Sequence, residues 1–236
     1  MLSNATFGFV VISWRYIALT VWVLIVVLSK SVSAQFLRDP QLFLQDRRIL
    51  IGTDARAIGM GSARTAGPTG GGSELWNPAL IGILDKTEFT LTSLPFTKES
   101  GDREGAVSLA MNLEQLQVSS TDMGNISISS WVDGWGADDS KSRMMLIGYG
   151  LDLKNGFSTG VSLRHHRRNF KTITKIGWGL DLGTTYTRKL PRLGDRVLFG
   201  LALSDIGGRF WQGGKLVRDE KMPLILRFGT TYYIDV

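Results

Sequence analysis

The segment "GWGLDLGTTYT", Gly177 to Thr187, alternates between two kinds of residue. Every second position is large and apolar or aromatic, except for one threonine: Trp178, Leu180, Leu182 and Tyr186. Glycine, aspartate and threonine fill the positions between them. Successive side chains of a strand point to opposite faces of its sheet. The segment therefore predicts a strand with one apolar face and one face of small or polar residues.

The same two-residue period recurs in 156–166, 196–204 and 224–234. Turns rich in Gly, Asp, Asn and Lys separate the predicted strands. Eight strands are predicted: 87–94, 105–113, 125–132, 143–153, 156–166, 177–189, 195–204 and 222–235. Most neighbours follow each other across short turns, and the Asn155-Gly156 dipeptide favours a tight hairpin. The fold class is thus all-β, with an antiparallel meander.

Two architectures fit this alternation. In a soluble sandwich the second face meets water and usually carries Lys, Glu and Thr. Here that face is largely glycine, alanine and serine, and glycine weakens a strand and packs nothing. An antiparallel transmembrane β-barrel explains it better, because the apolar side faces lipid and small inward residues let the sheet curl. Trp178 and Tyr186 are then about 20 Å apart along the membrane normal, near the spacing of two aromatic girdles.

Three charged residues fall on the predicted inward face: Arg164, Asp181 and Arg227. They form either a salt-bridge network that fills a narrow lumen or a polar track that guides a ligand head group.

The segment "GGRFWQGG", Gly207 to Gly214, is predicted to be a mobile rim loop that exposes Phe210 and Trp211. These two aromatic residues are expected to serve as an interfacial anchor or as a contact for a partner or ligand.

Residues 1–34 resemble a secretory signal. The apolar run "YIALTVWVLIVVL" follows Arg15, and small residues at Val32-Ser33-Ala34 predict cleavage after Ala34. An uncleaved anchor is the alternative, since the stretch from Phe7 nearly reaches the length of a spanning helix. Residues 35–85 then form an N-terminal plug or periplasmic segment, and residues 86–236 form the barrel.

The composition restricts the chemistry. The chain has no cysteine and only two histidines, which are adjacent, so a metal site or a cofactor is not expected. His165 and His166 point to opposite faces, and Ser162 shares a face with His166 at a separation of about 13 Å. That separation is too long for a hydrogen bond between a serine nucleophile and a histidine base, so we do not expect the protein to be an enzyme. The net charge is +6, but the basic residues are scattered, which argues against a nucleic-acid partner.

The stretch "GMGSARTAGPTGGGSELWNPALIG", Gly59 to Gly82, is rich in glycine. It lacks the third glycine of a dinucleotide loop and the lysine of a phosphate loop. We therefore expect a segment that folds into the lumen or across the mouth of the barrel, with Trp76 as its anchor. Asn77 is expected to cap a short helix, with Pro78 in the first turn.

Two pieces of this region, "DARAIGMGSARTA" and "LWNPALIG", together resemble the N-terminal signature of PorV/PorQ-like outer-membrane proteins, relatives of the FadL/TodX fatty-acid transporters. The later pieces "WGLDLGTTY", "LFGLALSDIGGRF" and "MPLILRFGTTYY" resemble the family's strands. The residues that match the signature are Arg56, Gly59, Met60, Gly61, Trp76, Asn77 and Pro78.

This resemblance implies an outer-membrane protein of a Gram-negative bacterium, in contact with outer-membrane lipid. It implies either a docking component for protein secretion, with secretion-system proteins as partners, or a channel for hydrophobic small molecules in which the N-terminal segment is the hatch. A membrane-anchored soluble β-domain is the third hypothesis. Family members have about fourteen strands where eight are predicted here, and the chain ends on Val236, so we expect a truncated or a reduced barrel.

Overall fold

The computed structural model describes residues 55–60, 63–95, 103–115, 123–135, 140–170, 173–190, 195–213 and 215–234. The predicted signal segment and Gly61 lie outside these residues. Within the described ranges, no helix has both the length and the apolar character needed to cross a bilayer.

The described residues form nine strands and three short helical pieces. The strands are β1 (Glu88–Pro95), β2 (Arg103–Asn112), β3 (Asn125–Trp135), β4 (Ser140–Asp152), β5 (Phe157–Phe170), β6 (Ile173–Lys189), β7 (Arg196–Gln212), β8 (Lys215–Lys221) and β9 (Ile225–Tyr233). The helical pieces are α4 (Ala55–Gly59), the 3-10 turn η2 (Ser73–Leu75) and α5 (Ala79–Gly82). The all-β fold class is therefore confirmed.

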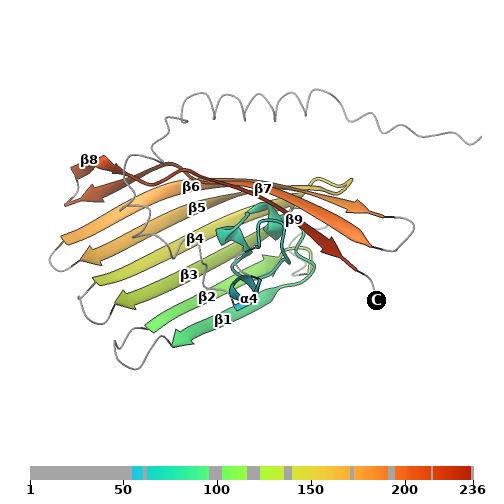
Figure 1. The fold of residues 1–236 in the computed structure, drawn as a ribbon, viewed down its shortest axis with the longest axis horizontal. Coiled ribbons are helices and arrows are strands. Elements are labelled where there is room, and N and C mark those ends of the chain that lie inside the picture. The colour runs from blue at the N-terminus through green and yellow to red at the C-terminus, as the bar shows by residue number, and fades with distance from the viewer. Residues whose placement is uncertain are drawn as a thin grey trace, which may run out of the picture. The chain divides into compact units, whose positions relative to one another are not determined.

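All nine strands belong to one antiparallel sheet, in which β1 to β7 pair in sequence order (Figure 1). Both β8 and β9 pair with β7, which is long enough to bind them one after the other along its free edge. The sheet is not closed. Within the described part of the chain, β1 pairs only with β2 and β9 pairs only with β7, so each has one edge without a partner strand. The expected barrel is therefore not closed by the described strands.

The hairpin between β4 and β5 confirms the turn predicted at Asn155-Gly156. Lys154, Asn155 and Gly156 have φ values of 67°, 53° and 83°. Asparagine and glycine tolerate this left-handed conformation better than other residues do. The turn ends with a hydrogen bond from the Leu153 amide to the Phe157 carbonyl, 2.8 Å long.

The predicted rim loop 207–214 is instead largely strand, because β7 continues to Gln212. Asp205 and Gly207 have positive φ values of 60° and 66°, and the pairing of β6 with β7 shifts register beside them. The sequence there resembles a turn, but the structure contains a β-bulge that lets the strand continue. Phe210 is consequently buried and Trp211 half-buried, so the expected exposure of Phe210 was wrong.

The two faces of the sheet differ as the alternation predicts. Leu180 and Phe228 are exposed on one face, here called the outer face. Glycines 183, 200 and 229 lie on the other face, here called the inner face, against residues 65–79. The adjacent histidines also separate as predicted, since His166 is buried and His165 packs its ring on outer-face Trp178, 4.4 Å between centroids.

Candidate functional site: the covered inner face

Residues 63–84, here called the covering segment, lie against the inner face of the sheet (Figure 1). Gly71 lies beside Ser108 and Thr90 at the β1 end, and Thr65 lies beside Gly229 of β9. Every residue from Ser73 to Gly82 is buried. A stretch of about twenty residues thus crosses the sheet from one edge strand to the other.

Glycines of the inner face let the backbone of the covering segment approach the strands. A Cβ added at Gly160 would lie 2.3 Å from the Pro78 carbonyl oxygen, and one at Gly150 would lie 2.2 Å from the Gly82 amide nitrogen. At Gly200 the same atom would lie 2.2 Å from the Thr65 carbonyl oxygen. Real Cβ atoms do not approach backbone this closely, so these three positions require glycine.

Asn77 fixes the middle of the covering segment. Its Oδ1 accepts a hydrogen bond from the Ala79 amide, 3.0 Å. The short helix α5 lies where it was expected, but Pro78 rather than Asn77 occupies its cap position. The Nδ2 of Asn77 donates to the Thr65 carbonyl at 2.9 Å and to the Thr184 carbonyl of β6 at 3.2 Å. One buried amide therefore joins two parts of the segment to the sheet.

Two asparagines at strand ends hold the last turn of the segment. Asn112 of β2 donates from Nδ2 to the Leu84 carbonyl at 2.7 Å, and Asn125 of β3 donates to the Ile81 carbonyl at 2.9 Å. They border a hollow of about 330 Å³ at the end of the sheet that carries the β4–β5 turn. Their side-chain amides donate hydrogen bonds to backbone carbonyls that have no partner within the helix at its C-terminal end.

Glu74 is a buried carboxylate in the covering segment. Its side chain is fully buried, and the Ser129 hydroxyl of β3 donates to its Oε1. Burial raises the pKa of Glu74 to about 7, although the positive charges of Arg64 and Arg164 act in the opposite direction. Burial likewise lowers the pKa of Arg64 to about 10. The segment therefore contains a group that titrates near neutral pH.

Of the three charges predicted to face inward, the structure pairs two. Arg164 of β5 contacts Asp181 of β6 at 2.5 Å between Nη2 and Oδ2, and both side chains are fully buried. Arg164 also donates from Nη2 to the Leu75 carbonyl at 3.4 Å, which joins the ion pair to the covering segment.

The third charge, Arg227 of β9, donates to the Ser204 hydroxyl at 2.6 Å and lies 5.6 Å from the centre of the Trp76 ring. Trp76 is buried as expected of an anchor, with Leu75 and Trp131 in the same apolar cluster. Arg227 thus packs over the anchor and makes no direct bond to the Arg164–Asp181 pair that the structure describes.

Asp205 and His166 extend the charged cluster. The backbone amide of Asp205 donates to Asp181 Oδ1 at 2.8 Å. The carboxylate oxygen Oδ1 of Asp205 lies 3.6 Å from Arg164 Nε and 3.6 Å from His166 Nε2. His166 meets the edge of the Phe210 ring, with 6.2 Å between centroids. The cluster therefore places two carboxylates beside Arg164 and His166 in a buried site.

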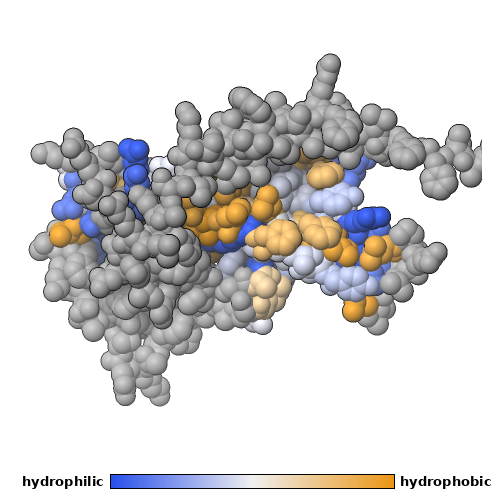
Figure 2. Space-filling model, turned by 45° about the horizontal axis from the view of Figure 1, so that its top comes forward, coloured by the Kyte–Doolittle hydropathy of each residue, from blue (hydrophilic) through white to orange (hydrophobic). Residues whose placement is uncertain are grey.

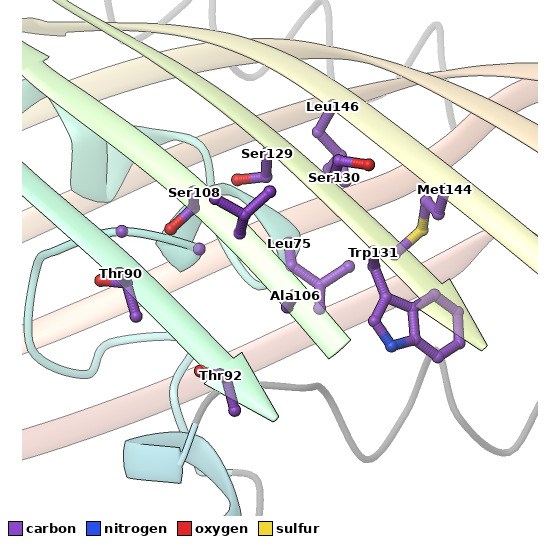
Figure 3. A pocket seen from close by; sticks show the side chains of 13 residues that line it. Leu75, Thr90, Thr92, Ala106, Ser108, Ser129, Ser130, Trp131, Met144 and Leu146 are labelled. Carbon is purple, nitrogen blue, oxygen red and sulfur yellow. The ribbon is translucent and has the colours of Figure 1, made fainter. Parts of the chain in front are cut away.

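Little empty space remains between the covering segment and the first four strands (Figure 3). A cavity of about 30 Å³ lies between Leu75 of the segment and Thr90, Ala106, Trp131 and Met144 of the sheet. This volume accommodates about one or two water molecules. It is too small for a fatty acid or a similar hydrophobic molecule.

The first half of the resembling signature lies away from this packing. Arg56 and Met60 are exposed at α4, where Arg56 forms an exposed ion pair with Glu88 at 3.4 Å. Gly59 has a negative φ and open space where a Cβ would lie, so neither a left-handed backbone nor a close approach requires glycine there. The second half, Trp76-Asn77-Pro78, lies at the centre of the buried segment.

The outer face is the second unusual surface. Large apolar side chains are exposed from β1 to β9, and Figure 2 shows such side chains in orange. Its most exposed members on interior strands include Ile147 of β4, 54%, and Leu163 of β5, 44%. Soluble monomers seldom expose contiguous apolar patches larger than a few hundred Å².

Several residues of the site were not found from the sequence. Glu74 lies in a glycine-rich stretch without a period, and the Asp205 bulge resembles a turn. Asn112 and Asn125 lie at predicted strand ends, where asparagine usually indicates a turn. Among the described residues, no group of three acidic or histidine side chains is arranged to hold a metal ion. No family model and no curated protein matches the chain.

Proposed function

We propose that this protein is an outer-membrane β-barrel component in which the covering segment acts as an inner plug, and that it docks proteins during secretion rather than conducting small molecules. One observation carries the proposal: the polarity of the sheet is inverted relative to a soluble protein. Leucine and phenylalanine are exposed on the outer face, whereas Arg164 and Asp181 are buried on the inner one.

The inverted polarity favours a lipid environment. A soluble sheet packs its apolar face and leaves charged side chains in water. A membrane-embedded sheet does the reverse, because apolar side chains meet acyl chains and charges face inward. The strands β4 to β7 have 13 to 17 residues, which exceeds the roughly 9–11 needed to cross the hydrocarbon core.

The filled inner face favours docking over conduction. The cavity beneath the covering segment has about 30 Å³, and the segment is held by buried backbone contacts and by Asn77. A channel for hydrophobic molecules needs a pocket of at least about 300 Å³ lined by apolar side chains. The hollow of about 330 Å³ at the end of the sheet is instead lined mainly by polar groups, among them Asn112, Asn125 and Asp152. In this proposal the plug stays in place and the exposed ends of the strands bind partner proteins.

The test uses the full chain expressed with its own N-terminus in a Gram-negative host. We expect recovery with outer membranes, faster migration on a gel before heating than after, and no release of a small dye from liposomes that contain the purified protein. A deletion of residues 59–82 should release the dye. Recovery as a soluble periplasmic protein would overturn the membrane assignment, and dye release by the intact protein would favour the channel.

A further inference from the structure

Two arginines lie directly opposite each other on the outer face of the sheet, at the end remote from the β4–β5 turn. Arg143 of β4 and Arg167 of β5 are register partners. Both side chains are exposed, and they share a face with Ile147 and Leu163, which lie four residues away along each strand. Side chains in directly opposite positions have Cβ atoms only about 4.5–5.5 Å apart, so two like charges there repel each other.

The structure shows no carboxylate that relieves this repulsion. None of the ion pairs between described residues includes Arg143 or Arg167. The side chains around the pair are apolar and exposed: Val132 lies opposite Arg143, Ile176 lies opposite Arg167, and Met145 is the next outward residue of β4. The two guanidinium groups therefore form a doubly positive site in an apolar surface.

The site lies where the apolar part of the outer face ends. Along β4 the outward residues change within four positions from the apolar Ile147 to Arg143. Trp178 of β6 lies beside this boundary and packs on the ring of His165, the outward residue next to Arg167 on β5. Tryptophan is enriched at the depth where the head groups of a bilayer begin. In a bilayer around the outer face, the two arginines would therefore lie at the level of lipid phosphate.

A second like-charge pair lies on the far side of Trp178. Arg209 of β7 is exposed and lies opposite Trp178 on one side and opposite the exposed Lys221 of β8 on the other. The other end of the outer face differs, because the exposed Arg188 of β6 lies opposite Val197 there. Like-charge pairs thus flank Trp178 at the same end of the face.

We propose that Arg143 and Arg167 bind the phosphate of a bilayer lipid whose acyl chains lie along the apolar outer face. A phosphate monoester carries about −1.5 to −2 charges at pH 7, so it offsets both arginines at once. It also accepts a forked pair of hydrogen bonds from a guanidinium group. The inference rests on the proposed membrane location of the outer face.

The surroundings of the arginine pair favour a lipid over an acidic protein segment. Val132, Met145 and Ile176 are all exposed beside the pair. The acyl chains of a lipid cover such side chains, whereas a string of carboxylates supplies the charge and leaves them in water. The arrangement therefore fits a molecule with one phosphate and an apolar part attached to it.

The experiment measures ligand binding to the full chain, purified in a non-ionic detergent, by isothermal titration calorimetry. The probes are dihexanoyl phosphatidic acid, dihexanoyl phosphatidylcholine and inorganic phosphate. The first has both a phosphate monoester and acyl chains, the second has the same chains but carries choline on its phosphate, and the third has no chains. We expect phosphatidic acid to bind more tightly than either of the other two.

Replacement by glutamine removes the charge of each arginine and keeps a polar side chain. Arg143→Gln and Arg167→Gln should each weaken the binding of phosphatidic acid by about fivefold. The double Arg143→Lys/Arg167→Lys variant should lose less than the double glutamine variant, because it keeps the charges but not the forked donors. Arg188→Gln is the matched control and should bind as the wild type does. Each variant must retain its faster migration before heating, which shows that it is folded.

Four results would overturn the inference. Equal binding of phosphatidylcholine would assign the affinity to the acyl chains alone, and equal binding of inorganic phosphate would assign it to a free anion. An equal loss in the Arg188→Gln control and in the arginine-pair variants would indicate attraction by net charge. Tighter binding of polyglutamate than of phosphatidic acid would assign the site to an acidic protein.

Recovery of the protein in outer membranes is measured separately from these titrations. A protein that is recovered there but does not prefer phosphatidic acid loses the lipid site and keeps the proposed function. Recovery as a soluble periplasmic protein removes the proposed function, whatever the titrations give.

Discussion

The outer and inner faces of this sheet come from alternate residues of the same strands, yet they behave in opposite ways. On β5, Leu163 is exposed and its neighbour Arg164 is fully buried. The outer face is apolar and uncovered in the described structure, whereas the inner face is small, polar and charged and is covered by residues 63–84. Alternation along a strand therefore decides whether a side chain is exposed on the outer face or packed against the covering segment.

The largest expected effect concerns the buried ion pair. Arg164→Met leaves Asp181 buried without its partner and should lower the free energy of unfolding by about 3–5 kcal/mol. Urea unfolding in liposomes followed by tryptophan fluorescence measures this. The exposed pair of Arg56 and Glu88 is the control, since Arg56→Ala should cost at most about 1 kcal/mol. Equal losses would mean that the two pairs are not differently buried.

An arginine placed on the outer face should lower the free energy of unfolding only where that face meets lipid. Leu163→Arg should lower the unfolding free energy by about 2–4 kcal/mol in liposomes, if Leu163 lies near the bilayer midplane. Thr159→Arg, four residues closer to the β4–β5 turn on the same face, should cost about 0–1 kcal/mol because it lies nearer the interface. No difference between the two variants would argue against a bilayer around this face.

Glu74 sharpens the comparison through pH. Its pKa is raised by burial from 4.5 to about 7, so the folded state binds the proton more tightly than the unfolded state does. The contribution of protonated Glu74 to the free energy of unfolding is complete below pH 4.5 and is lost as the pH rises through about 7. The wild type should therefore lose about 2–3 kcal/mol of unfolding free energy between pH 5 and pH 8.

Glu74→Gln is the matched variant, since it keeps the shape and the contact with Ser129 but cannot ionise. Its unfolding free energy should vary less between pH 5 and pH 8 than that of the wild type. An unchanged pH dependence would assign the titration to another group.

The smallest effect expected concerns the glycines under the covering segment. Gly160→Ala places a Cβ 2.3 Å from the Pro78 carbonyl oxygen and should cost about 1–3 kcal/mol. Gly105→Ala on β2 is the control, because its Cβ meets the Thr92 carbonyl oxygen at an ordinary 3.6 Å. Limited proteolysis should cut the covering segment faster in the first variant only. Equal cleavage rates would contradict the close contact.

The strands and their faces could be predicted from the sequence because both depend on a local period of two residues. The β4–β5 turn and the position of the short helix α5 depend on residue types with strong local preferences; the turn was confirmed, and the helix begins one or two residues from the expected position. The continuation of β7 through Asp205 could not be predicted, because its local sequence favours a turn and only pairing with β6 makes it a strand.

The site was predicted less completely for the same reason. Arg164 and Asp181 could be placed on one face by alternation, and they do pair. The burial of Glu74 and the contacts of Asn112 and Asn125 depend on how a segment without a period packs against strands far along the chain. No local pattern encodes such contacts.

The most direct test of the central claim compares two adjacent residues of β5 in native membranes. Val161 lies on the outer face and Ser162 is buried on the inner face. The Val161→Cys variant should react with a lipid-soluble maleimide and resist a charged, water-soluble one, and the Ser162→Cys variant should resist the lipid-soluble reagent. Rapid modification of the Val161→Cys variant by the water-soluble reagent would show that the apolar face does not meet lipid.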